Sequence, residues 1–164
     1  MFLTVNLTCK KHFIVLRAVT SCIMKKVLIL CTGNSCRSQM AHGYMQFFGG
    51  QSVSVYSAGI ETHGLNPRAV SIMQDAGIDI SQNTSNNVDE YSGISFDHII
   101  TVCDHAQENC PYIPSEKAQR WHRNFTDPSK LISENENEIT AVFAQTREEI
   151  KAFCKNFVDS YLLL

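Results

Sequence analysis

The spacing of apolar and polar residues along the chain predicts strands that alternate with helices. Four stretches have the length and the apolar or β-branched composition of strands, at 27–30, 53–56, 96–102 and 120–124. Three stretches carry a helical pattern, at 37–48, 66–75 and 138–161. Strands that alternate with helices form a parallel sheet covered on both faces, so the pattern predicts a single doubly wound α/β domain.

Local signals mark the ends of several of these elements. Asn66 and Pro67 are typical of the start of a helix, and Gly77 is typical of its end. The sequence Ser-Ala-Gly at 57–59 should end the second strand. Thr146 begins a Thr-x-x-Glu sequence, which predicts a second capped segment within the last helical stretch.

The length of the chain favours one domain. Its 164 residues, 44% of them apolar, suffice for one substantial core and are too few for two ordinary domains. Met24 and two lysines directly precede the first strand, so we expect the domain to comprise 24–164. Residues 1–23 make a poor signal peptide, because Arg17 interrupts their apolar stretch and no small-x-small cleavage site follows. We expect them to be an upstream over-extension of the reading frame or a loosely packed tail.

Charge and cysteine content limit the classes of function. A net charge of −2 gives the chain no basic footprint for nucleic acid. The sequence contains no run of about 18 apolar residues and therefore predicts no membrane span. Seven cysteines, without the spacing of a secreted disulfide framework, favour thiols with a chemical role in a reducing compartment. We therefore expect a soluble, monomeric, cytoplasmic protein that binds neither nucleic acid nor membranes.

The most informative stretch is a Cys-x5-Arg loop between the first strand and the first helix. Its residues are Cys31, Thr32, Gly33, Asn34, Ser35, Cys36, Arg37 and Ser38. A strand, a tight loop and a helix N-terminus aim backbone N–H groups and the positive end of the helix dipole at one point, which suits a tetrahedral oxyanion. Arg37 can hold two oxygens of that anion, and Gly33 and Asn34 suit the positive φ of a tight loop. In this setting we expect the pKa of Cys31 to lie well below that of a free thiol, about 8.5.

Two further thiols, Cys103 and Cys110, follow the third strand. In a helix they would share a face but lie about 10 Å apart along the axis, whereas a disulfide needs Cα atoms within roughly 7 Å. Bridging them requires the segment between them to unwind, and the polar residues 104–109 bury little that would resist this. The pair therefore indicates a conformational redox switch.

Simpler interpretations exist for both motifs. A structural cysteine followed by a chance arginine gives the same Cys-x5-Arg spacing, but the strand before Cys31 and the serine and helix after Arg37 argue against it. One core cysteine and one surface cysteine would account for Cys103 and Cys110. A structural zinc site fits poorly, since only His105 lies between the two thiols and no second Cys-x2-Cys unit exists.

The chain resembles the low-molecular-weight protein tyrosine phosphatase superfamily, and within it the thioredoxin-coupled arsenate reductases, in the strings CTGNSCRSQMAHGY and VYSAGIETHGLNPRA. The resemblance runs from about Val27 to the C-terminal helix. It implies a four-stranded parallel sheet flanked by helices, with Cys31 as nucleophile and Arg37 as oxyanion binder. Asn34 and Ser38 would stabilise the loop.

The same resemblance assigns roles outside the loop. The reductases carry a Cys-x6-Cys-Pro pattern at the place of Cys103 and Cys110. Asp127, in an Asp-Pro turn, would be the acid that protonates the leaving oxygen. The tyrosine phosphatases usually place an aromatic residue after that Asp-Pro, whereas this chain has Ser129, which favours a small inorganic substrate.

The activity that the resemblance implies is reduction of arsenate to arsenite, and hence arsenic detoxification. Cys31, Cys103 and Cys110 would form a relay that thioredoxin regenerates as electron donor, with no tightly bound cofactor. The alternative is a phosphatase that hydrolyses phosphoesters through a Cys31 phosphoenzyme, with the other two thiols as redox protection. Residual phosphatase activity is compatible with either. A non-enzymatic arsenic or redox sensor is disfavoured, because it needs neither Arg37 nor the acid loop.

The chain also departs from the family pattern. Some reductases bind potassium through two carboxylates where this chain has His42 and Asn86, so we expect no tight potassium site and no other metal site. The family often shows His-Trp before the acid loop, whereas this chain reads Trp-His-Arg at 121–123. We expect Cys36 to be structural. Three other cysteines match no motif: Cys9, Cys22 and Cys154.

Overall fold

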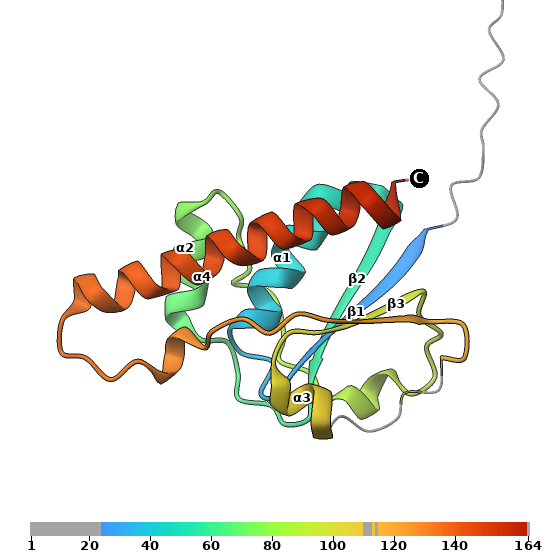
Figure 1. Ribbon diagram of the computed structural model, residues 1–164, viewed down its shortest axis with the longest axis horizontal. Helices are drawn as coiled ribbons and strands as arrows, with labels where there is room; N and C mark the ends of the chain where they lie inside the picture. Colours follow the sequence, from blue (N-terminus) through green and yellow to red (C-terminus); the bar gives the residue numbers. More distant parts are fainter. Residues whose placement is uncertain (1–23, 110–112, 114, 164) are drawn as a thin grey trace, which may run out of the picture.

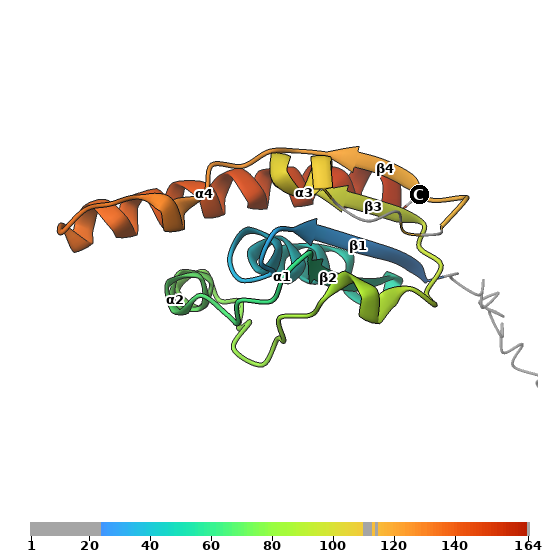
Figure 2. The same ribbon diagram turned by 90° about the horizontal axis from the view of Figure 1, so that it is seen from below.

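Four parallel strands form the sheet. The computed structural model describes residues 24–109, 113 and 115–163, so the predicted tail, 1–23, lies outside the described residues. The described strands are β1 Lys25–Cys31, β2 Val53–Gly59, β3 His98–Thr101 and β4 Gln119–His122. Their order across the sheet is β2-β1-β3-β4, and every neighbouring pair is parallel (Figure 1 for β1 to β3, Figure 2 for all four strands). The predicted α/β fold with a four-stranded parallel sheet is confirmed.

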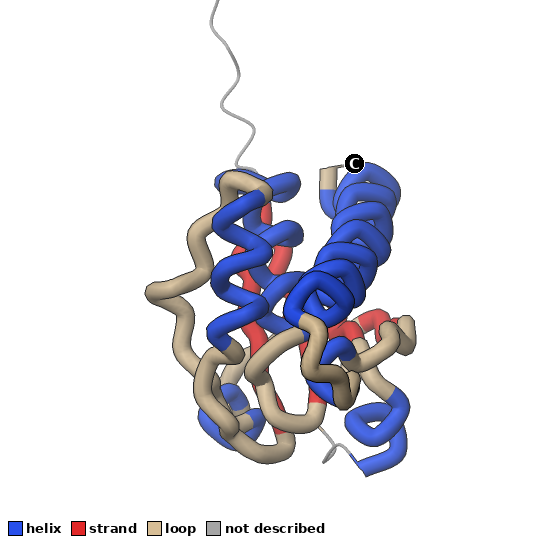
Figure 3. The backbone as a smooth tube through the Cα atoms, turned by 90° about the vertical axis from the view of Figure 1, so that its left-hand side faces the viewer, coloured by secondary structure: helices blue, strands red, loops and turns tan. Residues whose placement is uncertain are grey.

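Helices cover the two faces of this sheet unequally. The described α-helices are α1 Arg37–Gly49, α2 Pro67–Asp75, α3 Asp104–Asn109 and α4 Glu136–Phe157. Buried residues of α1, α2 and α4 share one core with Val27 and Ile29 of β1, and Figure 3 shows helices packed in front of the strands. The other face packs Leu28 and Leu30 against the short 3-10 helix Val88–Tyr91 and its flanking loops. No described helix is both long and apolar enough to cross a membrane.

α4 reaches along the group of helices to β3 and β4. Figure 2 shows its C-terminal end beside β3 and β4. There the Phe157 ring meets the Trp121 ring edge-on at 5.3 Å, and Trp121 Nε1 donates a hydrogen bond to His98 Nδ1 at 3.2 Å. The Trp-His-Arg sequence at 121–123 thus anchors β4 to α4 through its tryptophan.

The predicted limits of α2 are confirmed. The Asn66 side chain accepts hydrogen bonds from the backbone N–H groups of Arg68 and Ala69, and Pro67 occupies the first helical position. Gly77 follows the helix with a φ of 78°, a left-handed conformation that suits glycine.

Two predicted breaks are wrong. β2 continues to Gly59, because its last residues still pair with β1 as far as Cys31. α4 is a single helix that continues through Thr146. Thr146 is only 2% exposed, so it packs into the core and does not cap a second helix. β3 is shorter than the predicted 96–102 and spans the residues that pair with β1.

His42 connects α1 to the sheet and generates a prediction for stability. Its Nδ1 lies 3.0 Å from Ser57 Oγ of β2, and burial lowers the pKa of the imidazole to about 4. In the unfolded chain the pKa of this histidine is about 6.5. Between pH 6.5 and pH 4 the unfolded chain therefore binds a proton at His42 more readily than the folded protein does. We predict that the free energy of unfolding falls by up to ~3 kcal/mol as the pH drops from about 6.5 to about 4, with no further loss from this group below that range.

Urea unfolding of the wild type and of His42→Gln, at several pH values across this range, checks the prediction. Glutamine keeps a polar partner for Ser57 but does not titrate. The variant should therefore lose less stability than the wild type on acidification, and an equal loss in both proteins would assign the effect to other groups.

Candidate active site

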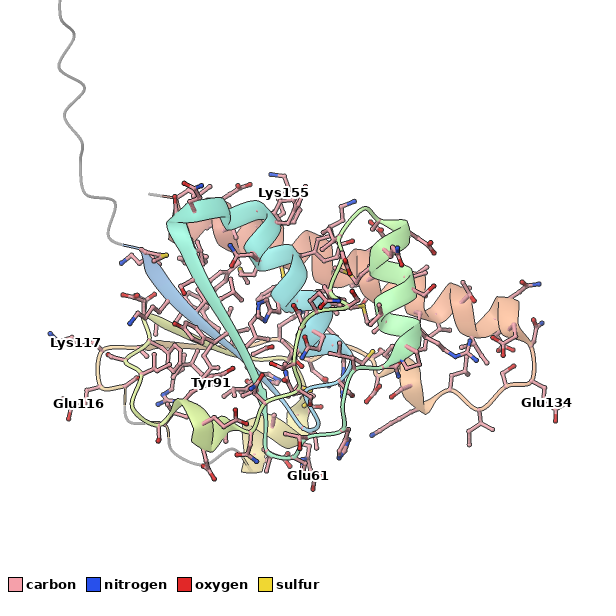
Figure 4. The ribbon with its side chains drawn as sticks, turned by 180° about the vertical axis from the view of Figure 1, so that it is seen from behind. Glu61, Tyr91, Glu116, Lys117, Glu134 and Lys155 are labelled. Carbon is pink, nitrogen blue, oxygen red and sulfur yellow. The ribbon has the colours of Figure 1, made fainter. Side chains whose placement is uncertain are left out.

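The strand ends at one edge of the sheet open into a cleft of about 750 Å³. Four segments line it: the Cys-x5-Arg loop at 31–37, the segment 61–63, the start of α3 at 103–105 and the stretch 124–130 after β4. In Figure 4, Glu61 marks this edge, where β1 and β2 lead into their loops. The Cys-x5-Arg loop, Cys103 and the turn at Asp127, which the sequence analysis considered separately, therefore meet at one site.

Asn34 makes the sharp turn of the loop. It is fully buried and has a φ of 45°, as predicted for this residue. Its Nδ2 donates to Ser38 Oγ at 3.0 Å, and its Oδ1 accepts from the backbone N–H of Asn86 at 2.9 Å. These bonds offset the cost of burying the amide and hold the loop against two neighbouring segments.

Gly33 serves the loop in a different way from the one predicted. Its φ is not positive, so that prediction is wrong. The His63 ring packs directly onto it instead, and a Cβ at this position would lie 2.3 Å from His63 Nδ1. His63 Nε2 lies 2.8 Å from Glu61 Oε2, which holds the ring at the cleft wall. A side chain at this position would have to displace the His63 ring, so close approach and not backbone conformation favours glycine here.

Arg37 ties the acid loop to the anion loop. The residue is 9% exposed. One guanidinium nitrogen donates to the Phe125 carbonyl at 2.9 Å, and the other donates to Asp127 Oδ2 at 2.7 Å. Asp127 Oδ1 in turn accepts from Ser129, through its backbone N–H at 3.1 Å and its hydroxyl at 2.6 Å. The structure thus places Asp127 beside the loop, at the cleft where a bound anion would meet it.

The N-terminus of α1 supplies the other part of an anion site. No described side chain caps its first turn, and that turn contains no acidic residue. The first N–H groups of a helix lack partners within the helix and carry the positive end of its dipole. They are therefore available to an oxyanion held by Arg37 above Cys31.

Cys31 and Cys103 form one coupled thiol pair. Both are buried and line the same cleft, and each thiol shifts the pKa of the other. The neighbouring Cys31 lowers the pKa of Cys103 to about 5, with help from Thr32, whose Oγ1 lies 3.4 Å from the sulfur, and from the backbone N–H of Ala106. The neighbouring Cys103, followed by burial, raises the pKa of Cys31. The two thiols therefore titrate as a pair that holds one negative charge more readily than two.

The loop acts on the pKa of Cys31 in the direction that we predicted, because Ser38 and the backbone of Asn34 lower it. Cys103 and burial raise the same pKa, because two adjacent thiols cannot both ionise readily. The negative charge therefore belongs to the coupled pair.

Of the remaining five cysteines, two lie within the described residues and three lie outside them. Cys36 lines the cleft, and burial, assisted by the charge of Asp127, raises the pKa of its thiol to about 12. Cys154 is fully buried in the core, which raises its pKa still further, and it donates to the Ala41 carbonyl. Both are neutral thiols. Three others lie outside the described residues: Cys9, Cys22 and Cys110.

Gln39 is a site residue that the sequence did not indicate. It is fully buried, and its Nε2 donates to Asn34 O at 3.0 Å, to Asn34 Oδ1 at 3.1 Å and to Thr84 O at 2.9 Å. Its Oε1 accepts from Asn83 Nδ2 at 3.0 Å. A glutamine in the first turn of a helix is ordinary, so no sequence pattern marks this role.

His42 and Asn86 stand where some reductases carry potassium ligands, and here both are hydrogen-bonded to other residues of the protein. His42 lies against Ser57, and Asn86 binds Asn34 through its N–H and Glu90 Oε2 through its side chain. Within 24–109, 113 and 115–163, no three His, Cys, Asp or Glu side chains are grouped as metal ligands would be. The absence of a tight potassium site stays a prediction.

Comparison with known proteins agrees with this geometry. Residues 26–162 match the family of low molecular weight phosphotyrosine protein phosphatases. The chain belongs to this family. Among its relatives, the arsenate reductase of Halalkalibacterium halodurans is 46% identical over 136 residues, which make up 83% of this chain and 96% of that protein. The arsenate reductase of Bacillus subtilis is 43% identical over 136 residues, with the same shares of both chains.

Solved structures of family members have the same fold. An arsenate reductase in the phosphate binding state has a TM-score of 0.68 at 29% identity, covering 83% of this chain and 98% of that chain. The low molecular weight protein tyrosine phosphatase from T. tengcongensis has a TM-score of 0.67 at 22% identity, covering 82% and 98%, and supports the fold alone.

The contacts of Gln39 generate a prediction. Gln39→Leu leaves buried oxygens of Asn34 and Thr84 without their donor, which should destabilise the protein by about 2–4 kcal/mol and loosen the loop. Protection of Cys31 from alkylation by added phosphate should then need a higher phosphate concentration than in the wild type.

Gln46→Leu is the matched control, because Gln46 lies on the same helix but donates only to Gly50 O at an exposed position. It should behave like the wild type in both the unfolding and the protection measurement. Equal behaviour of the two variants would contradict the role of Gln39.

Proposed function

We propose that the protein reduces arsenate to arsenite. The observation that carries this proposal is the contact between Cys31 and Cys103 inside an oxyanion cleft. Phosphate-ester hydrolysis needs one thiol, whereas reduction of arsenic needs a second thiol within reach of the first. The arsenate reductases among the relatives support the choice of substrate.

Binding of the anion would exchange partners at Arg37. In the structure Asp127 occupies one arm of the guanidinium. An oxyanion offers the same kind of acceptor and would displace the carboxylate. Separated from Arg37, the Asp127 carboxyl would face the bound anion and donate a proton to the leaving oxygen.

The first chemical step would form a bond from Cys31 to arsenic. The sulfur attacks arsenic, an As–O bond breaks, and the oxygen leaves as water after taking a proton from Asp127. In the second step the Cys103 thiolate attacks the Cys31 sulfur. An S–S bond forms, the S–As bond breaks, and its electron pair stays on arsenic, which leaves as arsenite in the +3 state.

The third step would return Cys31 to its starting state. Cys110 attacks Cys103, Cys31 leaves as a thiolate, and a disulfide links Cys103 to Cys110. The helical conformation of α3 supports the need for rearrangement, because a helix would keep the two thiols too far apart for a bond. Thioredoxin, the proposed electron donor, then reduces this disulfide, which fits a cytoplasmic enzyme of arsenical resistance.

A phosphatase is the second candidate, and family membership favours it. The Cys31 loop, Arg37 and Asp127 contain the groups that phosphoester hydrolysis requires. Ser129 replaces the aromatic residue expected for a phosphotyrosine substrate, so we propose this only as a side activity.

The two candidates differ in their need for Cys103. With thioredoxin, thioredoxin reductase and NADPH, we predict NADPH consumption by the wild type only when arsenate is added. Cys103→Ser should abolish it, whereas hydrolysis of a phosphoester should survive this change. Arsenate-independent consumption, or full activity of Cys103→Ser, would overturn the proposed relay.

The order of the thiols makes a separate prediction for Cys110. Cys110→Ser should release about one arsenite per enzyme and stop as a Cys31–Cys103 disulfide, because only the last exchange is lost. Cys103→Ser should stop earlier, with arsenic retained on Cys31. Intact-mass spectrometry after one turnover distinguishes these states, and sustained turnover of Cys110→Ser would show that Cys110 is not the resolving thiol.

A further inference from the structure

Three polar residues join the start of α3 to the end of β4. Asp104, the first residue of α3, has one carboxylate oxygen 3.1 Å from His122 Nε2, and its other oxygen accepts a hydrogen bond from Asn124 Nδ2 at 2.5 Å. The far side of the His122 ring is fixed as well, since its Nδ1 lies 2.9 Å from Thr101 Oγ1 of β3. We call Asp104, His122 and Asn124 the clamp.

The clamp holds the residue next to the second thiol. Asp104 directly follows Cys103, so fixing its side chain fixes the direction in which the chain leaves Cys103. α3 contains six residues, and isolated helices shorter than about 12 residues are marginal in water, so it depends on contacts with the rest of the protein. Ala106 provides one such contact by burial. The clamp provides another, on the polar side of the helix.

The clamp makes no described hydrogen bond to the other reacting groups. Its described hydrogen bonds reach Thr101 and no residue of the Cys-x5-Arg loop, and neither Arg37 nor Asp127 is bonded to it in the structure. His122, unlike Asp104 and Asn124, does not line the cleft, so its loss should change the placement of Cys103 and leave the Cys31 site intact. His122 and Asn124 belong to the stretch between Trp121 and Phe125 that leads into the acid loop.

We propose that Asp104, His122 and Asn124 are positioning residues that aim Cys103 at the Cys31 sulfur. The inference rests on the proposed relay and concerns its second step alone. While the later part of α3 rearranges, the clamp keeps the Cys103 end of the helix in place. Misplacing a reacting group by about 1 Å can cost up to 10²-fold in rate, and we expect roughly a tenfold loss when an exposed clamp of this kind is removed.

The test separates the first two steps of the relay. The variant His122→Ala, whose side chain does not line the cleft, should release arsenite about tenfold more slowly than the wild type in a single turnover. In a Cys103→Ser background, the same change should leave the rate at which arsenic binds to Cys31 unaltered, as followed by intact mass. Equal slowing of both steps would show a general disturbance of the cleft and overturn the proposal, as would unaltered arsenite release.

Two further variants sharpen the result. His122→Gln retains an N–H donor near the position of Nε2 and should restore most of the rate of arsenite release. Arg123→Ala is the matched control, because Arg123 lies in the same stretch but stacks over the Phe125 ring at 5.7 Å and does not touch Asp104. It should release arsenite at the wild-type rate, and a tenfold loss in this control would overturn the proposal.

Thiol reactivity tests, without any arsenic chemistry, whether the clamp positions Cys103. Mass-spectrometric mapping of iodoacetamide labelling should show a changed rate at Cys103 in His122→Ala and an unchanged rate at Cys31, with His122→Gln close to the wild type. Absence of arsenite release from the wild type would refute the proposed function. An unchanged labelling rate at Cys103 would refute the clamp.

Discussion

The turn between β1 and α1 is the constraint on which the site depends. Asn34 adopts a positive φ at full burial, so each of its polar atoms needs a partner from the protein. Gln39 and Ser38 of α1 supply some, and Asn86 supplies another from a segment far along the chain. A shift of β1 by one residue would move Cys31 and break these bonds together. The register of the central strand and the shape of the anion site are therefore a single structural requirement.

A chain with net negative charge can bind an anion here because the positive charge is local and already paired. A buried guanidinium without a partner would be costly, and Asp127 removes that cost in the structure. An incoming oxyanion replaces one acceptor by another, so Arg37 loses little on exchange. The carboxylate that leaves is the group that the chemistry needs next. The pairing of Arg37 with Asp127 therefore serves both stability and the proposed acid step.

The sequence predicted those features that local pattern determines. The apolar run of β1, the Cys-x5-Arg loop and the ends of α2 were predicted because strand length, spacing and capping residues encode them. Gly59 and Thr146 show where local signals fail, since pairing with β1 extends one strand and burial in α4 overrides a capping sequence. The proximity of Cys31 and Cys103 follows from the order of the sheet, because β1 and β3 are parallel neighbours.

The parts that could not be predicted depend on side chains that reach between distant segments. Gln39 bonds to Thr84, and Asp104 bonds to His122, across gaps that no periodicity encodes. The coupling of Cys31 to Cys103 was also missed, because a pKa set by a neighbour requires the neighbour's position.

The coupling of the two thiols gives the proposed relay its order. A pair of neighbouring thiols holds one negative charge more readily than two. Once the Cys31 sulfur is bonded to arsenic, it carries no charge that could oppose a thiolate at Cys103. Thr32 and the N–H of Ala106 continue to stabilise that thiolate without Cys31. The second nucleophile is thus ready when the first becomes its target, and the clamp at Asp104 fixes the direction from which it attacks.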